Sequence, residues 1–355
     1  MKIRIHGMLD PHTHLRDLDW AHKATFTSET QAALAGGYTA VFDMPNTPPN
    51  TTTQSALHTK LEALQARACC DYGVFFGASQ AHNQDEYRGL RGVCGLKIFN
   101  NATTGTLLID SQAERLAHYQ AWDNGKVIAV HAEGETVRDI LEIVRQTRRF
   151  THFLHISTAE EIQYLRDAKE EGLPISIGVC PHHLYLTEND VPVLGNLGRM
   201  KPELKTQRDQ QALWEALQGG VIDVIESDHA PHTLAEKHDP SGRVVFGVSG
   251  LETTLPLMLL AVHEGRLTLD QLPLLLAENP RRIFGVPTQA DTYTDIETES
   301  RWNIDRAKLH TACGWSPFEG MTVFGKVERV VIRGQLAYDG EQVCVDAGFG
   351  RNVFA

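Results

Sequence analysis

Asp10-Pro11-His12-Thr13-His14-Leu15-Arg16-Asp17 decides the fold, because this stretch places two imidazoles at the end of the apolar run 3–9. In an extended strand, residues i and i+2 point to the same side, so His12 and His14 can converge on one metal ion. Imidazole nitrogen is a good zinc ligand, and two such ligands leave room for others. Two histidines on one strand face are more often core-packing or surface residues than metal ligands. A metal site therefore requires further ligands from the rest of the chain.

Short apolar and β-branched runs alternate with longer segments of helical period along the whole chain. We expect strands at 3–9, 39–42, 72–76, 93–99, 127–130, 153–156, 175–179 and 222–225. We expect helices at 27–36, 54–68, 111–122, 135–148, 159–170, 209–217, 252–264 and 269–278. Eight buried strands with helices between them favour an α/β fold, a (β/α)8 TIM-type barrel. An open doubly wound sheet remains possible, although no glycine-rich phosphate loop follows the first strand.

The last part of the chain differs in kind from the barrel pattern. Residues 289–300 are polar and aperiodic, so we expect a crossing loop there. Residues 322–332 and 335–338 are expected to form strands around a turn at Gly334. The sequence therefore predicts a barrel over residues 1–288 and, over residues 289–355, the crossing loop with a small β subdomain packed on the barrel.

Composition excludes several classes of function for the 355-residue chain. A net charge of -12 leaves no basic excess to neutralise phosphates, so we expect no nucleic-acid partner. No secretory leader or long apolar window is visible, so we expect no membrane association. The six cysteines are scattered without a CxxC pair, which is typical of a reduced, cytoplasmic protein.

Polar side chains gather at the ends of the predicted strands. They are His12 and His14 on the first strand, Asn46 after the second, Lys97 on the fourth, His131 ending the fifth, His155 on the sixth, and Asp228 with His232 after the eighth. In a barrel of this type, all these strand ends open onto one face, where active sites are found. Three histidines and an aspartate there would make a catalytic zinc site.

Lys97 lies inside the apolar run Gly95-Leu96-Lys97-Ile98-Phe99, where a bare ammonium group is costly to bury. A buried lysine with a lowered pKa can be neutral and nucleophilic, so it could take up carbon dioxide and become a carbamate. A carbamate is a two-oxygen anion that can bridge two metal ions. The alternative is a lysine whose ammonium group reaches solvent at the strand end.

The strand ends carry a set of motifs that is far more specific together than singly. They are Asp10-Pro11-His12-Thr13-His14-Leu15-Arg16, Met44-Pro45-Asn46-Thr47, Gly95-Leu96-Lys97-Ile98-Phe99, His131-Ala132-Glu133, Pro181-His182-His183-Leu184, Ser227-Asp228-His229-Ala230-Pro231-His232-Thr233, Gly250-Leu251-Glu252-Thr253, Asn279-Pro280-Arg281-Arg282-Ile283-Phe284 and Trp315-Ser316-Pro317-Phe318-Glu319-Gly320. This set resembles dihydroorotases of the amidohydrolase superfamily over nearly the whole chain. The resemblance is closest to the dihydroorotase domains of animal multifunctional pyrimidine-synthesis proteins.

The resemblance implies two zinc ions bridged by a carboxylated Lys97 and a hydroxide. One ion would be held by His12, His14, the carbamate and Asp228, and the second by the carbamate, His131 and His155. Asp228 would be the catalytic acid and base that moves the proton between water and the ring nitrogen. The implied reaction is the reversible cyclisation of N-carbamoyl-L-aspartate to L-dihydroorotate in de novo pyrimidine biosynthesis.

The implied substrate carries a carboxylate, which calls for a fork-shaped cation. Arg16 fits this role by the family pattern, with Asn46 and His232 as hydrogen-bonding neighbours. The plainer interpretations are a surface arginine and an ordinary loop histidine. The loop 100–105 matches the position of a mobile lid, and its small, polar composition suits one.

Within that lid, we expect Thr103 or Thr104 to touch substrate. The chain departs from the family pattern at Lys201, where close relatives have an arginine that contacts substrate. A lysine keeps the charge but loses the two-pronged geometry. Some relatives hold an extra zinc through a cysteine and a glutamate, whose positions here are Leu154 and Gly178, so no third ion is expected.

Two rival functions stay open. A hydantoinase or allantoinase would use a similar metal centre on another cyclic amide. A non-catalytic dihydroorotase-like protein would instead serve as a partner of aspartate transcarbamoylase, and such proteins lose ligands. The resemblance also implies a homodimer, and the remaining histidines His182, His183 and His229 are expected to support neighbours rather than bind metal.

Overall fold

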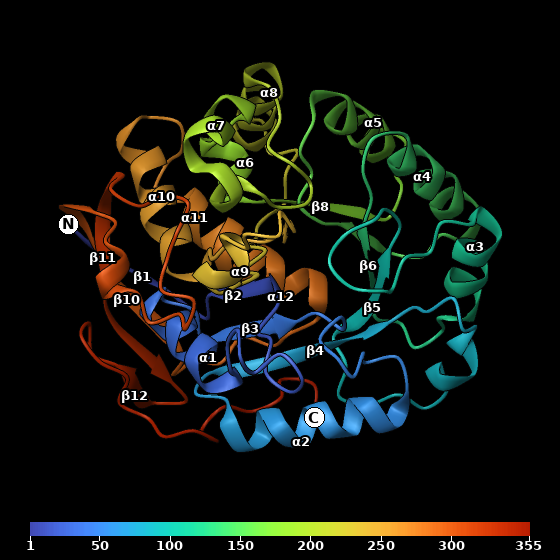
Figure 1. The fold of residues 1–355 in the computed structure, drawn as a ribbon, viewed down its shortest axis with the longest axis horizontal. Helices are drawn as coiled ribbons and strands as arrows, with labels where there is room; N and C mark the ends of the chain where they lie inside the picture. The colour runs from blue at the N-terminus through green and yellow to red at the C-terminus, as the bar shows by residue number, and fades with distance from the viewer.

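The computed structural model describes residues 1–355 and contains a parallel sheet of eight strands that are neighbours in chain order. The strands are β2 Leu9–Thr13, β3 Ala40–Asp43, β4 Asp71–Gly77, β5 Gly95–Phe99, β6 Val127–His131, β7 Thr151–Phe153, β8 Ile175–Val179 and β9 Val224–Ile225. An isolated parallel bridge between Thr13 and His229 joins the two outer ends, so the sheet is a nearly closed barrel. The predicted TIM-type α/β fold is confirmed (Figure 1).

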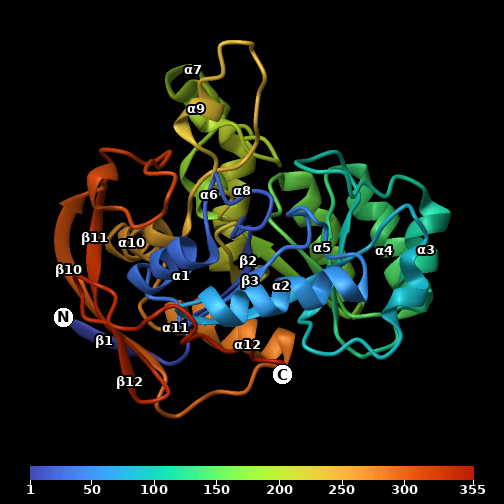
Figure 2. The same ribbon diagram turned by 60° about the horizontal axis from the view of Figure 1, so that its bottom comes forward.

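Helices surround this barrel (Figures 1 and 2). The α-helices are α1 Phe26–Ala35, α2 Gln54–Arg67, α3 Gln112–Ala121, α4 Glu135–Thr147, α5 Ala159–Glu170, α6 Pro181–Tyr185, α7 Val191–Leu194, α8 Gln207–Gln218, α9 Leu234–Lys237, α10 Leu251–His263, α11 Gln271–Pro273 and α12 Asn279–Phe284. Short 3-10 segments are η1 Asn83–Tyr87, η2 Glu188–Asp190, η3 Gly195–Gly198 and η5 Arg306–Lys308, and η4 Leu274–Glu278 is a π-helical turn. The helix predicted at 269–278 lies, from residue 271 onward, in a continuous helical stretch that runs to 284 and has the π-helical turn in its middle.

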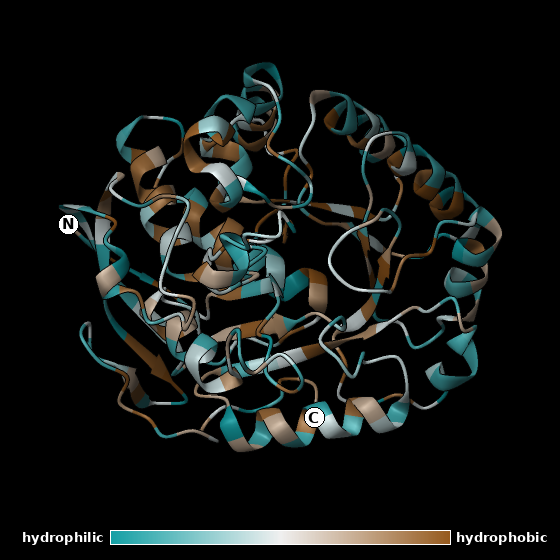
Figure 3. Cartoon of the chain, viewed as in Figure 1, coloured by the Kyte–Doolittle hydropathy of each residue, from teal (hydrophilic) through white to brown (hydrophobic).

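Local sequence explains where the barrel helices begin and which side they bury. Thr158 caps α5 through a reciprocal pair of hydrogen bonds with Glu161, and Thr206 caps α8 in the same way with Asp209. Helix α4 buries Val137, Ile140, Leu141, Ile143 and Val144, which recur at helical spacing. Hydrophobic residues accordingly concentrate in the strands, and the outer helices carry both hydrophobic and hydrophilic stretches (Figure 3).

Aromatic rings fill the amino end of the barrel. The ring centroid of Phe284, from α12, lies 5.4 Å from that of Phe42 and 5.9 Å from that of Phe75, both in edge-to-face arrangement. Phe354, near the end of the chain, packs on Phe42 at 5.4 Å. This end is closed by apolar packing, so polar chemistry is left to the carboxyl ends of the strands. None of the helices is long and apolar enough to cross a membrane.

A second, antiparallel sheet has the strand order β1-β10-β11-β12 and packs beside α10 and α1 (Figure 2). Its strands are β1 Lys2–Ile5, β10 Tyr293–Asn303, β11 Thr322–Ile332 and β12 Gln335–Tyr338. The predicted strands 322–332 and 335–338 are confirmed. The predicted crossing loop at 289–300 is wrong from Tyr293 onward, because polar residues there alternate, with Thr294, Ile296 and Thr298 buried and their neighbours more exposed.

The apolar run 3–9 also divides between the two sheets. Residues 2–5 form β1 and pair with β10, and the chain then turns at Gly7, which has a φ of +68°. Only β2, from Leu9, belongs to the barrel. The small sheet thus takes one strand from within the predicted barrel segment 1–288, and the division at residue 288 otherwise stays a prediction.

A buried ion pair fixes the end of β3 beneath the candidate site. Lys60 Nζ of α2 donates to Asp43 Oδ2 at 2.7 Å and to the carbonyl of Met44 at 2.9 Å. Asp43 Oδ1 in turn accepts from the backbone N–H of Leu15, next to His14, at 2.7 Å. Both ionic side chains are fully buried.

We expect Lys60→Met to lower the free energy of unfolding by about 3–5 kcal/mol, because it leaves the Asp43 carboxylate buried without its cation. Urea unfolding followed by tryptophan fluorescence measures the change. Lys308→Met, at an exposed lysine, is the control and is expected to change it by less than about 0.5 kcal/mol. Equal stability of the two variants would contradict the structural role of the pair.

Candidate metal centre

The structure brings the predicted histidines and Asp228 together at the carboxyl ends of the strands. Asp228 Oδ1 lies 3.1 Å from His12 Nε2 and 3.2 Å from His14 Nε2. His131 Nδ1 lies 2.9 Å from His155 Nε2. One donor atom each from His12, His155 and Asp228 falls within 4.8 Å of the others, and all three residues are buried. Side chains from four strands thus surround one point.

Lys97 lies on β5 with its side chain fully buried, and its Nζ has no hydrogen-bond partner. The Nζ sits 4.6 Å from the centre of the Phe99 ring. Burial lowers the pKa of Lys97 to about 7, against the opposing pull of Asp228 and Glu226. The alternative in which the ammonium group reaches solvent is therefore wrong for this structure.

The donor set fits a metal ion. Burial lowers the pKa of His12, His14, His131 and His155, which keeps these imidazoles neutral. The Nδ1 atoms of His12 and His155 are buried without a hydrogen-bond partner, as is the Lys97 amine. Buried polar atoms are rarely left unpaired, and neutral imidazole lone pairs are ligands for divalent cations.

Buried carboxylates below the site hold the backbone of the ligand-bearing segments, and sequence reasoning missed them. Asp10 Oδ1 accepts from His12 N at 3.0 Å, and Asp10 Oδ2 accepts from Ser227 N at 3.2 Å. Glu226 Oε1 accepts from His155 N at 2.6 Å. These bonds tie β2, β7 and the loop after β9 together, next to each ligand.

Several site residues adopt a left-handed backbone conformation that side chains usually avoid. The φ angles are +64° at Arg16, +37° at His155 and +45° at Asp228. Such conformations cost about 1–3 kcal/mol each and persist where the surroundings hold them, often at functional sites. Here the hydrogen bond from His155 N to Glu226 and that from Ser227 N to Asp10 hold the backbone at His155 and next to Asp228.

Glu226 occupies space that only a glycine at residue 178 leaves free. A Cβ atom on Gly178 would lie 2.4 Å from Glu226 Oε1. Burial opposes ionisation of Glu226, but the imidazoles of His12 and His152 beside it hold the pKa of its carboxyl below the usual range. His12 Nδ1 lies 3.6 Å from Glu226 Oε1, and His152 Nε2 lies 3.2 Å from Oε2. The carboxylate therefore faces the second nitrogen of a candidate ligand.

Arg16, Asn46 and His232, the residues predicted to contact substrate, lie beside the ligand cluster. Arg16 is buried, its Nε donates to the carbonyl of Pro231 at 3.1 Å, and its Nη1 has no partner. Asn46 Oδ1 lies 2.8 Å from His14 Nδ1, which links it to a candidate ligand. Arg16 is thus a buried cation with a free N–H group rather than a surface arginine.

The tautomer of His232 follows from its neighbours. Its Nε2 lies 3.0 Å from the carbonyl of Phe246, which can only accept, so Nε2 carries the proton. Its Nδ1 then accepts from Lys23 Nζ at 3.0 Å. The 3.4 Å approach of Arg16 Nη2 to His232 Nε2 joins two donors and is not a hydrogen bond.

The lid residues and Lys201 gather around Phe246. Thr104 Oγ1 donates to the Phe246 carbonyl at 3.0 Å, and Asn46 Nδ2 donates to the carbonyl of Thr104 at 2.9 Å. Lys201 Nζ lies 5.0 Å from the centre of the Phe246 ring. Thr103, Thr104, His232 and Phe246 line a cavity of about 540 Å³. The residues predicted to contact substrate are therefore neighbours.

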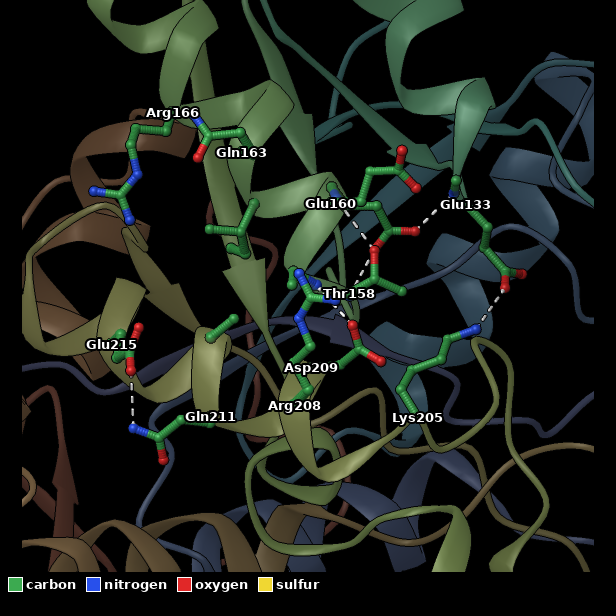
Figure 4. Close-up of a pocket in the computed structure, with 15 residues that line it drawn as sticks. Glu133, Thr158, Glu160, Gln163, Arg166, Lys205, Arg208, Asp209, Gln211 and Glu215 are labelled. Atoms are coloured by element: carbon green, nitrogen blue, oxygen red, sulfur yellow. Dashed lines mark hydrogen bonds and ion pairs between the residues drawn. The ribbon is translucent and has the colours of Figure 1, made fainter.

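A cleft of about 1120 Å³ lies outside the strand barrel, between α5 and α8 (Figure 4). It reaches the candidate centre only through Glu133, whose Oε1 lies 3.0 Å from His131 Nε2. Glu133 Oε2 also faces Lys205 Nζ at 3.8 Å. An acceptor on Nε2 orients the His131 ring and leaves its Nδ1 for a cation. Glu133 belongs to the motif His131-Ala132-Glu133, but the motif did not predict this role.

His229 has the supporting position that was predicted for it. Its Nε2 lies 2.6 Å from Glu29 Oε2, and its Nδ1 accepts from the backbone N–H of Gly250 at 3.1 Å. Both nitrogens are used, so none is free for a metal ion. His182 and His183 differ, because each is buried with one nitrogen unpartnered.

A sequence-family comparison matches residues 5–336 to the amidohydrolase family. The chain is 43% identical to the multifunctional protein CAD of Squalus acanthias over 99% of its own length, but it spans only 16% of that protein. It is 32% identical to the dihydroorotase of Pyrococcus furiosus, covering 96% of this chain and 83% of that enzyme. These matches confirm the resemblance that the motifs predicted.

Solved structures show the same fold. An L-hydantoinase from Arthrobacter aurescens superposes with a TM-score of 0.93 at 25% identity, over 99% of this chain and 88% of that one. The inactive dihydroorotase-like domain of a CAD-like protein from Chaetomium thermophilum gives a TM-score of 0.82 at 26% identity, over 99% of both chains. The fold is therefore shared by catalytic and inactive proteins, so function must be argued from the site.

We expect Gly178→Ala to lower the free energy of unfolding by about 1–3 kcal/mol, because the added methyl group displaces the Glu226 carboxylate. Thermal unfolding measures the change. In a Glu226→Ala background, the same substitution should cost much less, because the crowded atoms are gone. Equal costs in both backgrounds would show that Gly178 and Glu226 are not coupled.

Proposed function

Because the chain belongs to the amidohydrolase family, we propose that it is a zinc-dependent dihydroorotase, which interconverts N-carbamoyl-L-aspartate and L-dihydroorotate. The observation that carries this proposal is the convergence of four neutral histidines and Asp228 around a buried, unpartnered Lys97. In addition, this chain covers 83% of the length of a dihydroorotase. We propose that this reaction is a step of pyrimidine biosynthesis.

The proposed ligands divide into two sets that share Lys97 as its carbamate. The first set is His12, His14 and Asp228, and the second is His131 and His155. Bound zinc ions would lower the pKa of a water molecule and polarise the amide carbonyl of the ring. Carboxylation would remove the unpaired buried ammonium group and supply an anion that the bound cations would neutralise.

Asp228 is the proposed proton carrier. Burial raises the pKa of its carboxyl group, while His12 and Lys97 oppose that change. A carboxylate with a raised pKa is a stronger base, so its oxygen can accept the proton of the attacking water. In hydrolysis it then returns the proton to the ring nitrogen as the amide bond breaks, and in cyclisation the same transfers run in reverse.

Arg16 is the proposed partner of the substrate carboxylate. Its Nη1 is buried without an acceptor, and a bound carboxylate would supply one. Asn46 and His232 flank that position, and Lys201, Thr103 and Thr104 are proposed to contact substrate from the lid side. Lys201 is partly exposed and faces Glu203 at 3.6 Å, so its contribution is a single charge without the arginine fork.

Two other functions are distinguishable. A hydantoinase is favoured by the fold similarity alone, and hydantoin lacks the carboxylate that Arg16 would bind. A non-catalytic role is favoured by the similar fold of an inactive domain. Against it, the histidine and aspartate ligands and Lys97 all converge here, and their retention is expected only if metal is bound.

We also propose that the chain forms a homodimer and associates with aspartate transcarbamoylase. The 43% identity to a segment of a multifunctional protein supports this proposal. Size-exclusion chromatography with light scattering, with and without purified aspartate transcarbamoylase, would test both. A monomer that elutes unchanged beside that enzyme would argue against them.

We expect the purified chain to hydrolyse dihydroorotate in preference to hydantoin and allantoin. Arg16→Lys should lower kcat/KM for dihydroorotate by about 10–100-fold, since a paired charge-assisted hydrogen bond is lost. Activity on hydantoin, if any, should change little. A wild-type preference for hydantoin would overturn the substrate assignment.

Lys97 should control metal uptake through its protonation state. Carbon dioxide reacts with a neutral amine, and a pKa of about 7 makes the neutral fraction rise from pH 6 to pH 8. We therefore expect the chelator-treated protein to rebind zinc faster at pH 8 than at pH 6, and only with bicarbonate present. Elemental analysis measures the bound zinc.

Lys97→Ala is the control for this experiment, because alanine cannot form a carbamate. It should bind less zinc at both pH values and show no dependence on bicarbonate. Zinc uptake by the wild-type protein that is independent of bicarbonate would contradict a carboxylated lysine. Absence of bound zinc under all conditions would favour the non-catalytic role.

A further inference from the structure

Three soft metal-ligand side chains lie together at the end of β8, outside the proposed ligand sets. Cys180 follows β8 directly, and His182 and His183 lie in the short helix α6. One donor atom from each of the three falls within 4.8 Å of the other two. The exposed fraction is 0% for Cys180 and 2% for each histidine, so the cluster is closed to bulk water.

The hydrogen bonds of His183 show which of its nitrogens is free. Its Nε2 lies 3.0 Å from the carbonyl of Pro202, and a carbonyl can only accept, so Nε2 carries the proton. The lone pair is therefore on Nδ1, which is buried without a partner. A carbonyl acceptor on one nitrogen is the arrangement that fixes the tautomer of a metal-binding histidine.

His182 adds a second unsatisfied atom to the same place. Its Nε2 is buried without a hydrogen-bond partner, and its ring centroid lies 4.4 Å from that of His183. Most buried side-chain polar atoms find a partner, so two orphaned imidazole nitrogens in adjacent residues need an explanation. Packing alone does not supply one, because neither nitrogen gains anything from apolar contact.

We propose that Cys180, His182 and His183 form an additional metal site for a thiophilic divalent cation, with Zn²⁺ as the preferred ion. Thiolate and imidazole are its preferred ligands, whereas Mg²⁺ and Ca²⁺ take oxygen. Binding displaces the thiol proton of Cys180 to solvent and uses the imidazole lone pairs. Three protein ligands leave the fourth tetrahedral position open.

This site differs from the extra zinc position considered from sequence, which would need side chains at Leu154 and Gly178. Leu154 has an apolar side chain and Gly178 has none, so neither can bind a metal ion. Glu226 fills the space beside Gly178. Cys180 is two residues after Gly178, so the new cluster lies higher on the same strand path, towards the mouth of the barrel. The proposed two-zinc centre contains no sulfur, so a sulfur-based signal reports the new site alone.

The test uses the full-length chain, stripped with a chelator and reloaded with Co²⁺ and bicarbonate. We expect three metal equivalents per chain and a thiolate-to-cobalt charge-transfer absorption in the near ultraviolet. Cys180→Ala should bind two equivalents and lose that absorption. His183→Asn should also bind one equivalent fewer. Circular dichroism checks that each variant is folded.

Cys94→Ala is the matched control, because Cys94 is equally buried but belongs to no metal-ligand cluster. It should keep three equivalents and the absorption. Two equivalents in the wild-type protein without the absorption would overturn the additional site and leave the two-zinc proposal intact. An absorption that persists in Cys180→Ala, or vanishes in Cys94→Ala, would also overturn it. If Cys180→Ala does not fold, the wild-type stoichiometry and absorption decide.

Discussion

Buried acidic side chains at the carboxyl end of the barrel are the constraint on which the rest of the site depends. Asp10, Asp43, Glu226 and Asp228 are almost fully buried within the same region. Removing a carboxylate from water costs several kcal/mol unless hydrogen bonds or cations compensate. Backbone N–H groups satisfy three of these acids, and Lys60 neutralises Asp43. Asp228 faces the imidazoles of His12 and His14 instead, so a cation bound there would compensate its burial.

The same acids explain how strained backbone survives beside them. His155 and Asp228 hold left-handed conformations, and the Glu226 and Asp10 carboxylates accept N–H groups from His155 and Ser227. A hydrogen bond to a charged acceptor contributes about 1.5–3 kcal/mol, which is comparable to the strain at one residue. The backbone at the candidate ligands is thus held by the protein itself, and an ion that bound only the folded state would add its binding free energy to stability.

The barrel could be predicted from sequence because its strands are short apolar runs between segments of helical period. The strand at 293–303 could not, since it is mostly polar and its buried face is marked by Thr294, Ile296 and Thr298, of which only Ile296 is apolar. The candidate ligand histidines stand at strand ends, and the family resemblance implied their role. Glu226 was missed because its role depends on the missing side chain of Gly178, and such complementarity between two strands has no local signature.

The loop 100–105 and His232 are joined through one carbonyl oxygen. Phe246 O accepts from both His232 and Thr104, so the His232 N–H is occupied in this structure. If a carboxylate accepted the His232 N–H, it would replace one of the two hydrogen bonds that the Phe246 carbonyl accepts. The Thr104 carbonyl in turn accepts from Asn46, whose Oδ1 faces the candidate ligand His14. Phe246, Thr104 and the orientation of the His14 imidazole are therefore linked through a single chain of hydrogen bonds.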